Sequence, residues 1–292
     1  MSRKVKVAII GTGNIGTDLL IKVLRSEKLE CVKFVGRNSL STGMRRASEL
    51  GVSCSDQSIE FFKRTDEHID VVFDATSASA HVTNDEVFSE KGIVCIDMTP
   101  ALIGPMTLPT LCETTFKEAR NFNMVTCGGQ ASVPIAAAYS KVCKLDYVEG
   151  ISSIASRSAG PATRDNLDEY INTTEIALKQ FTNASKSKAI LNLNPASPPI
   201  DMQTTVRALV DGYCNVDFLR QSVISAVEEV SKFVPGYKLV FGPVLEGNTI
   251  ISTVRVKGNG DYLPSYAGNL DIINAAAISV AEKFFDQRGH EK

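Results

Sequence analysis

Cys127 is the residue of this sequence best placed to act as a nucleophile. It follows an apolar segment that predicts a strand over residues 122–125 and precedes a segment that predicts a helix over 131–142, within the run Asn123-Met124-Val125-Thr126-Cys127-Gly128-Gly129-Gln130. A thiol at such a strand-to-helix junction lies beside the unpaired first amides of the helix, where the helix dipole favours an anion. The sequence therefore predicts a reactive thiolate at Cys127, with amides near Gly128 and Gly129 to stabilise an oxyanion.

A glycine-rich run near the start of the chain supplies the second chemical signal. It follows a strand expected over 5–10, opens a helix expected over 17–26, and reads Gly11-Thr12-Gly13-Asn14-Ile15-Gly16. In this context Gly11 permits a tight turn, Gly13 lets the backbone approach a pyrophosphate, and Gly16 lets helix and strand pack closely. The run predicts a dinucleotide site; the alternative is a glycine-rich turn without a ligand.

The second expected strand, 31–35, ends without the acidic residue that usually holds the adenosine ribose. In its place stands Gly36-Arg37-Asn38-Ser39. Arg37 and Ser39 together fit a 2′-phosphate, which predicts that NADP(H) binds as well as NAD(H) or better. The alternative is that Arg37 only stacks on adenine or faces solvent.

The elements that must hold these residues alternate between strand and helix in the first part of the chain. Further strands are expected over 52–54, 70–74 and 93–97, with a helix over 42–50. This alternation predicts an α/β fold with a doubly wound parallel sheet.

From about residue 127 onward the pattern predicts a second, α+β lobe. Longer helices at 167–181 and 218–233 are interleaved with strands of one mostly antiparallel sheet, expected at 150–157, 189–194, 237–242 and 249–257. An alanine-rich helix over 270–285 is apolar on most sides and is expected to be buried. We therefore expect a dinucleotide-binding domain at 1–126, a catalytic and dimerisation domain at 127–268, and a C-terminal helix at 269–292 that packs back on the first domain.

The composition excludes several classes of function. With 31 basic and 33 acidic residues, a net charge of -2 and no basic block, the chain is not expected to bind nucleic acid. No apolar run approaches the ~20 residues that span a bilayer, and we expect a cytoplasmic protein. The seven cysteines are irregularly spaced and the three histidines are scattered, so neither a disulfide framework nor a metal site is expected.

Six segments, spread over nearly the whole chain, give it a family resemblance. They are the run from Gly11 through Asp18 to Leu19, Phe73-Asp74-Ala75-Thr76-Ser77-Ala78, Ile96-Asp97-Met98-Thr99-Pro100-Ala101, the cysteine run through Ala131, Ser158-Ala159-Gly160-Pro161-Ala162-Thr163-Arg164 and Tyr266-Ala267-Gly268-Asn269-Leu270-Asp271-Ile272. Together they resemble the acylating acetaldehyde dehydrogenases, which convert an aldehyde, NAD and coenzyme A to an acyl-CoA. The layout, a Rossmann-type domain with a second lobe, is similar to that of semialdehyde and glyceraldehyde-phosphate dehydrogenases.

The resemblance implies roles for particular residues. Cys127 would carry an acyl-thioester intermediate. Nucleotide contacts would come from Thr12, Asn14 and Ile15 of the glycine run, from Asn269, and from a loop made of Ser158, Ala159, Gly160, Pro161, Ala162, Thr163, Arg164, Asp165 and Asn166. It also implies a homodimer and a 4-hydroxy-2-oxovalerate aldolase partner that supplies acetaldehyde.

The chain departs from the family pattern where an aspartate is the proposed base for the cysteine. After Pro198-Pro199 the matching position is Thr204, within Ile200-Asp201-Met202-Gln203-Thr204-Thr205. Either Asp201 takes over this role or no carboxylate base exists. A thiol of pKa ~8.5 is already a few per cent ionised at neutral pH, so loss of this help costs at most about 30-fold in rate.

Other residues have structural interpretations. His81 is expected to cap the helix that follows it, the alternative being a place beside the nicotinamide, and Asp74 and Asp97 are expected to be turn and cap residues. Arg164 meets a cofactor phosphate or forms a surface salt bridge. Two alternatives to the aldehyde dehydrogenase function remain: an NADPH-dependent reductase of a larger acyl thioester, and a nucleotide-binding partner subunit that has lost turnover.

Overall fold

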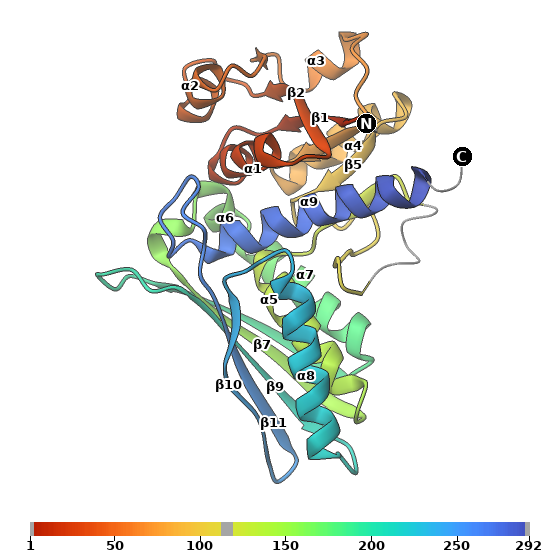
Figure 1. The fold of residues 1–292 in the computed structure, drawn as a ribbon, viewed down its shortest axis with the longest axis vertical. Coiled ribbons are helices and arrows are strands. Elements are labelled where there is room, and N and C mark those ends of the chain that lie inside the picture. Colours follow the sequence, from red (N-terminus) through yellow and green to blue (C-terminus); the bar gives the residue numbers. More distant parts are fainter. Residues whose placement is uncertain (1–2, 112–118, 290–292) are drawn as a thin grey trace. The chain divides into compact units, whose positions relative to one another are not determined.

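The chain folds into two compact units, described here from a computed structural model (Figure 1). The structure describes residues 3–111 and 119–289, so that Cys112 and His290, which the sequence counts include, lie outside it. The first unit comprises residues 1–124 and 274–292, and the second comprises 125–273.

The first unit is built on a six-stranded parallel sheet in the order β3-β2-β1-β4-β5-β6. Its strands are β1 Val5–Ile10, β2 Leu29–Val35, β3 Cys54–Ser55, β4 Val71–Asp74, β5 Val94–Asp97 and β6 Asn121–Asn123. Helices α1 Asn14–Arg25, α2 Thr42–Glu49, α3 Ile59–Arg64 and α4 Ala78–Glu90 connect them. β4 and β5 are buried along their whole length, as expected of strands covered on both faces. The predicted doubly wound α/β sheet is confirmed.

Strand register aligns the carboxyl ends of four neighbouring strands. Ile10 pairs with Asp74, Asp74 with Asp97, and Asp97 with Asn123. Ligands of open α/β sheets bind outside this edge. The polar residues at the strand ends therefore lie in one row along the edge at which such a fold binds its ligands.

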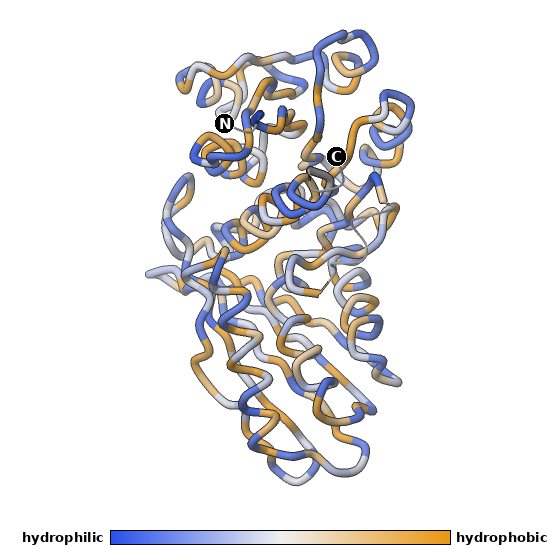
Figure 2. The backbone as a smooth tube through the Cα atoms, turned by 45° about the vertical axis from the view of Figure 1, so that its right-hand side comes forward, coloured by the Kyte–Doolittle hydropathy of each residue, from blue (hydrophilic) through white to orange (hydrophobic). Residues whose placement is uncertain are grey.

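The second unit has a five-stranded sheet in the order β10-β11-β9-β7-β8. Its strands are β7 Leu145–Ala155, β8 Lys186–Asn194, β9 Met202–Val210, β10 Tyr237–Glu246 and β11 Thr249–Val256. Only the β7–β8 pair is parallel among the pairs described, so the predicted mostly antiparallel sheet is confirmed. The strands alternate between hydrophobic and hydrophilic residues (Figure 2), and β9, which the sequence analysis did not predict, shows this alternation in its burial.

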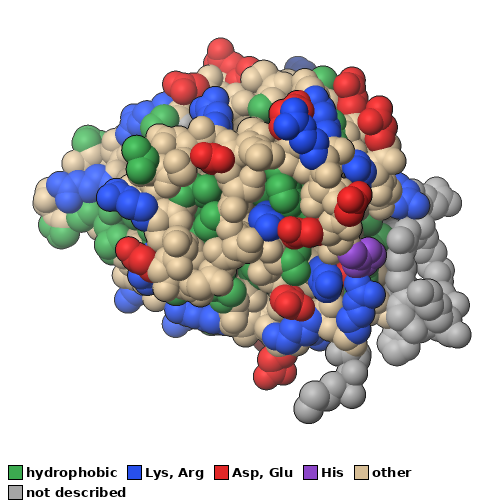
Figure 3. All heavy atoms as spheres, turned by 90° about the horizontal axis from the view of Figure 1, so that it is seen from above, with side chains coloured by type: hydrophobic (Ala, Val, Ile, Leu, Met, Phe, Trp, Pro, Cys, Tyr) green, Lys and Arg blue, Asp and Glu red, His purple; other side chains and the backbone are tan. Residues whose placement is uncertain are grey.

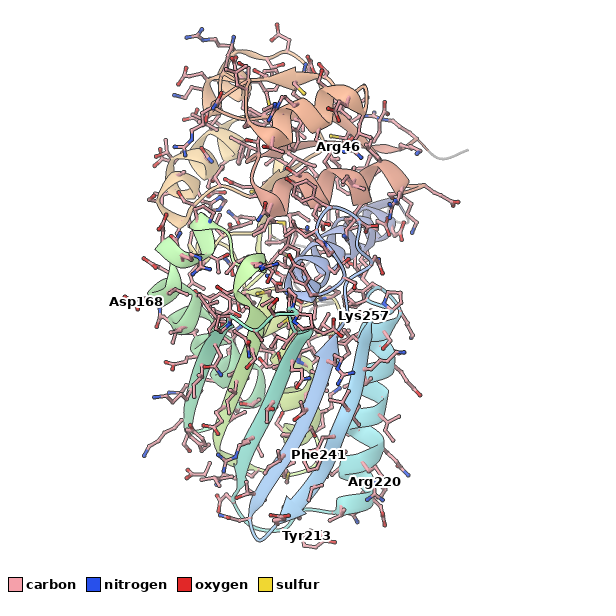
Figure 4. The ribbon with its side chains drawn as sticks, turned by 90° about the vertical axis from the view of Figure 1, so that its left-hand side faces the viewer. Arg46, Asp168, Tyr213, Arg220, Phe241 and Lys257 are labelled. Atoms are coloured by element: carbon pink, nitrogen blue, oxygen red, sulfur yellow. The ribbon has the colours of Figure 1, made fainter. Side chains whose placement is uncertain are left out.

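Three long helices of the second unit, α5 Cys127–Ser140, α7 Leu167–Thr182 and α8 Val216–Ser231, pack on the sheet. Between β7 and α7 lie a short 3-10 turn, Ser156–Ser158, and helix α6, Pro161–Asp165. Asp168 marks the first turn of α7, while Phe241 lies on the edge strand β10 and Tyr213 between β9 and α8 (Figure 4). Tyr213 and Phe241 are among the exposed large apolar side chains of this unit.

The last helix, α9 Gly268–Gly289, begins in the second unit and joins the first from Asn274 onward. Asn274 Nδ2 donates to Asp18 Oδ2 at 2.6 Å, and Ser26 Oγ donates to Glu282 Oε1 at 2.8 Å. The rings of Phe284 and Phe122 meet edge to face, with centroids 5.2 Å apart. These contacts confirm that the C-terminal helix returns to the first lobe.

Basic and acidic side chains are interspersed over the face shown in Figure 3, in keeping with the net charge of -2. In the part of the chain that the structure describes, none of the helices combines the length and apolarity needed to cross a membrane.

Candidate active site

Cys127 is the first residue of α5, which begins four residues before the predicted start at 131. Thr126 is its N-cap, and the Thr126 hydroxyl accepts a hydrogen bond from the Gly129 amide at 2.8 Å. The sequence analysis expected the two glycines to precede the helix, but this side-chain cap stabilises helical backbone across both of them. The sulfur therefore lies at the amino terminus of α5.

The backbone that leads into α5 is strained. Val125 has a φ of 61°, in the left-handed region that β-branched residues rarely adopt. A Cβ on Gly129 would lie 2.6 Å from Val125 Cγ1, so the turn requires a residue without a side chain there. The sharp turn and the glycine together present the thiol at the start of the helix.

Helix α7 holds this turn at two points, one helical turn apart. The Tyr170 hydroxyl lies 3.5 Å from Cys127 Sγ and accepts a hydrogen bond from the Gly128 amide at 2.8 Å. The hydroxyls of Thr174 and Thr126 are 2.7 Å apart. A Cβ on Gly128 would lie 2.2 Å from the Tyr170 hydroxyl oxygen, so Gly128 makes room for the phenol.

Two opposing effects act on the Cys127 thiol. Burial raises its pKa, while the hydrogen bond with Tyr170 and the amides of Gly128 and Cys127 act in the opposite direction without cancelling it. The helix terminus acts as the sequence predicts, but burial outweighs it. The thiol is therefore mainly protonated at neutral pH and reacts through its minor thiolate form.

The Gly128 and Gly129 amides, which the sequence suggests as oxyanion donors, both have protein acceptors in this structure. The Gly128 amide donates to Tyr170 and the Gly129 amide donates to Thr126. The side-chain donor that faces the sulfur is instead the Tyr170 hydroxyl, which the sequence analysis missed.

The two residues proposed in place of the missing base lie in different surroundings. Thr204 is fully buried on β9, and its hydroxyl is 2.9 Å from that of Ser152. Ser152 Oγ in turn lies 3.0 Å from the position that a Cβ on Gly128 would take. Asp201 precedes β9 and makes no hydrogen bond or ion pair with any residue that the structure describes. These contacts connect Thr204, through Ser152, to the surroundings of the thiol.

The glycine run in the first unit has the geometry of a pyrophosphate site. Gly11 has a φ of 109°, and a Cβ there would lie 2.4 Å from the Ala75 carbonyl oxygen. A Cβ on Gly16 would lie 1.9 Å from the Gly11 carbonyl oxygen, whereas one on Gly13 would meet no atom within 4 Å. Gly13 is also the N-cap of α1 and leaves its first amides without a side-chain cap. Open space over Gly13 and an uncapped helix terminus fit a bound pyrophosphate.

Arg37 lies beside this run. The Gly11 amide donates to the Val35 carbonyl at 3.0 Å, which joins the glycine turn to the end of β2. Arg37 and Ser39 follow that strand and are exposed. Their side chains are therefore accessible at the edge where the adenosine ribose of a dinucleotide lies in this fold.

The loop from Ser158 to Asn166 is held together by one of its own side chains. Arg164 donates to the carbonyls of Ala159 and Ser156 and to the Ser156 hydroxyl, at 3.2, 2.8 and 2.9 Å. Among the described residues Arg164 forms these internal hydrogen bonds and not the surface salt bridge, one of the two roles that the sequence suggests for it. The loop residues themselves form helix α6, with Gly160 as its N-cap, and lead into α7 at Asn166.

Asn269, in the first turn of α9, is buried, and its side-chain oxygen has no hydrogen-bond partner among the described residues. A buried acceptor without a partner costs roughly 1–3 kcal/mol of desolvation. The free acceptor fits a donor group of a bound cofactor.

A buried polar cluster at the strand ends of the first unit is the feature that sequence reasoning underestimated. His81, fully buried in α4, lies 2.9 Å from Asp74, 2.9 Å from Asn121 and 3.4 Å from Asp97. Ser77, and not His81, caps α4. Asp74 and Asp97 do accept from the amides of Thr76 and Thr99, as turn residues do, and also face the imidazole. The sequence did offer one indication of this cluster, because Asp74 and Asp97 stand at the ends of two strands that are adjacent in the sheet.

Proton binding by this cluster favours the folded state in mildly acidic solution. Burial opposes the charge on His81, but the Asp74 hydrogen bond and the charges of Asp97, Asp74 and Asp85 raise its pKa. Burial raises the pKa of Asp97 to about 6. Both groups bind protons more tightly in the folded chain, so their stabilising contribution is lost as the pH rises through about 6 and then through the raised pKa of His81.

We expect His81→Gln to remove the part of this pH dependence that stems from the imidazole. Urea unfolding of the wild type should give a free energy of unfolding that falls between pH 6 and 8, with a smaller fall in the variant. His68→Gln is the matched control, because His68 is exposed beside Asp70. Equal slopes in wild type and His81→Gln would contradict this account.

Known proteins resemble the chain over nearly its whole length. Residues 6–119 match the family model described as semialdehyde dehydrogenase, NAD binding domain, and residues 127–264 match prokaryotic acetaldehyde dehydrogenase, dimerisation. A protein of Pectobacterium atrosepticum named acetaldehyde dehydrogenase is 56% identical over 97% of this chain and 96% of its own. One of Spirochaeta aurantia with the same name is 54% identical over 97% and 95%.

Among solved structures, aspartate semialdehyde dehydrogenase II from Vibrio cholerae shares the fold. Its TM-score is 0.63 at 13% identity, with 97% of this chain and 99% of that chain covered. The first unit thus corresponds to an NAD-binding domain, and the second carries a dimerisation domain that supports a homodimer. Taken with identities near one half over the full length, these findings show that the chain belongs to the acetaldehyde dehydrogenase family of aldehyde oxidoreductases.

Proposed function

We propose that the protein is an acylating aldehyde dehydrogenase that oxidises acetaldehyde or another short aldehyde to its acyl-CoA. The observation that carries the proposal is the thiol of Cys127 at the amino terminus of α5, beside the hydroxyl of Tyr170. Cys127 adds to the aldehyde carbonyl through its thiolate, and the adduct loses hydride to become a thioester. The thiol of coenzyme A then attacks the thioester, releases acyl-CoA and restores Cys127.

Bound NAD supplies the hydride acceptor for this reaction. The turn from Gly11 to Gly16 and the uncapped end of α1 would hold the pyrophosphate. By family membership, Asn269 and the loop from Ser158 to Asn166 are further candidate cofactor contacts, and the unpaired Asn269 oxygen is an available acceptor. These residues orient the cofactor, while Cys127 performs the covalent chemistry.

No carboxylate needs to contact the thiol in this scheme. Thr204 and Ser152 are neutral hydroxyls at neutral pH, so they position the surroundings of Gly128 without accepting the proton of Cys127. The proton of the Cys127 thiol then passes to solvent, either before or after the substrate binds. The small fraction of thiolate limits the rate of attack on the aldehyde.

The test is a product analysis. The protein should convert acetaldehyde, NAD and coenzyme A to acetyl-CoA and NADH, identified by mass spectrometry and absorbance. Omission of coenzyme A should stop multiple turnover. Formation of free acetate without any acetyl-CoA would refute the acylating step.

Arg37 favours a second candidate, an NADPH-dependent reductase of a larger acyl thioester, since no acidic residue follows β2 to reject a 2′-phosphate. We expect Arg37→Ala to raise the Km for NADP(H) by about 10-fold or more and to leave that for NAD(H) nearly unchanged. Arg46→Ala is the control, because Arg46 is an exposed arginine of α2 paired with Glu49 (Figure 4). An equal effect on both cofactors would contradict a role in 2′-phosphate binding.

By family membership, we also propose an aldolase that releases acetaldehyde as a partner. Co-purification of the tagged protein with such an activity tests this partnership, and a lone homodimer in the pulled-down fraction would argue against it.

A further inference from the structure

Protons around the Cys127 turn can be assigned from the hydrogen bonds. Thr174 donates to the Tyr170 carbonyl at 2.7 Å, so Thr126 is the donor in the Thr126–Thr174 pair. The Gly128 amide donates to the Tyr170 hydroxyl oxygen. A phenol carries one proton, and the acceptors within its reach are Cys127 Sγ, 3.5 Å away, and the hydroxyl oxygen of Thr126.

We propose that Tyr170 is a catalytic residue that donates its hydrogen bond first to the Cys127 thiolate and then to the oxygen of the thiohemiacetal. This inference rests on the proposed function and assigns the oxyanion donor that the occupied Gly128 and Gly129 amides do not supply. The Tyr170 hydroxyl thus contacts the sulfur before the thiolate attacks the aldehyde, and it stabilises the oxyanion that forms afterwards.

The negative charge moves from sulfur to oxygen during the reaction, so the hydrogen-bond donor must be able to contact both atoms. When the S–C bond forms, the carbonyl π pair moves to oxygen, and the negative charge leaves sulfur for an atom two bonds away. When hydride departs to NAD, an oxygen pair reforms the carbonyl and gives the thioester. Tyr170 keeps its proton throughout, because burial and the neighbouring thiol raise its pKa well above the usual value.

The phenol is fixed in advance for this task. Its side chain is buried, its oxygen is held by the Gly128 amide, and its own carbonyl is held by Thr174. Gly128 leaves room for the phenol, because a Cβ there would lie only 2.2 Å from the Tyr170 hydroxyl oxygen. A fixed donor in a water-poor site needs no reorganisation as charge develops, which is the condition for effective transition-state stabilisation.

The test compares Tyr170→Phe with Tyr139→Phe. Tyr139 is another buried tyrosine of this unit, and its hydroxyl donates to the Val206 carbonyl, so its variant measures the loss of a buried hydroxyl away from the thiol. One readout is the rate of Cys127 alkylation by iodoacetamide against pH, without substrates. The other is the single-turnover burst of NADH from acetaldehyde and NAD without coenzyme A.

We expect Tyr170→Phe to slow alkylation at pH 7 by about 3- to 10-fold, with rates that converge with wild type in alkaline solution, because the thiolate loses a donor. The burst rate should fall by about 10²-fold, as for the loss of one oxyanion donor. Gly128→Ala is a second variant, since its methyl group would displace the phenol, and should give the same two effects.

Profiles of Tyr170→Phe that match Tyr139→Phe in both experiments would overturn the proposal. A shifted alkylation profile with an unchanged burst would overturn the oxyanion role alone. If wild type forms no NADH at all, the proposed function fails, and the alkylation profile still decides whether Tyr170 stabilises the thiolate.

Discussion

Replacement of Cys127 with serine is expected to lower kcat for aldehyde oxidation by roughly four orders of magnitude or more. A serine hydroxyl ionises far less readily than a thiol, and here it would lie at a half-buried position where ionisation is already opposed. An oxygen ester would also be a poorer acyl donor to coenzyme A. The change is nearly isosteric, so folding and NAD binding should be retained.

Cys143→Ser is the matched control for this substitution. Cys143 follows the same helix, is buried, and its thiol donates to the Tyr139 carbonyl, so it tests the loss of a buried sulfur without the reaction. NADH formation and NAD affinity should be measured for both variants. Activity of Cys127→Ser within 10-fold of wild type would refute covalent catalysis at this residue.

The second large effect is expected from alanine at Gly16. The new Cβ would lie 1.9 Å from the Gly11 carbonyl oxygen, a backbone atom that cannot move without opening the turn. We expect a loss of about 3 kcal/mol in the free energy of unfolding, together with loss of NAD binding. Urea unfolding and calorimetric titration with NAD measure the two quantities.

Gly13→Ala separates stability from binding. A Cβ at this position would meet no protein atom within 4 Å, so the free energy of unfolding should change by no more than about 0.5 kcal/mol. The methyl group would instead occupy space proposed for the pyrophosphate, and NAD affinity should fall by about 10-fold or more. Unchanged NAD affinity in Gly13→Ala would contradict the placement of the pyrophosphate at this turn.

Local patterns predicted the parallel sheet and the antiparallel character of the second sheet, but not its middle strand, β9. Alternation of strand and helix predicted the parallel sheet, and alternating polarity predicted the second one, because both patterns reflect burial of one or both faces of a strand. Helix starts were less predictable: α5 begins at Cys127 and α1 at Asn14, since a side-chain cap or an N-terminal glycine decides the start and periodicity does not.

The partners of the thiol could not be predicted in the same way. Tyr170 reaches Cys127 from another helix, 43 residues along the chain, and nothing in its own sequence context distinguishes it from a core tyrosine. Thr204 was named from a family position, but its contact with Ser152 depends on the pairing of β7 with β9. His81 acquires its partners in a similar way, from strands that lie side by side only in the folded sheet.

The most direct test of the proposed function is to trap the acyl-enzyme. The wild-type protein would be mixed with acetaldehyde and NAD without coenzyme A, quenched, digested and analysed by mass spectrometry. We predict that the peptide containing Cys127 gains the mass of one acetyl group, and that added coenzyme A removes it. An active enzyme whose Cys127 peptide stays unmodified, or which carries the acetyl group on another residue, would contradict the covalent role of Cys127.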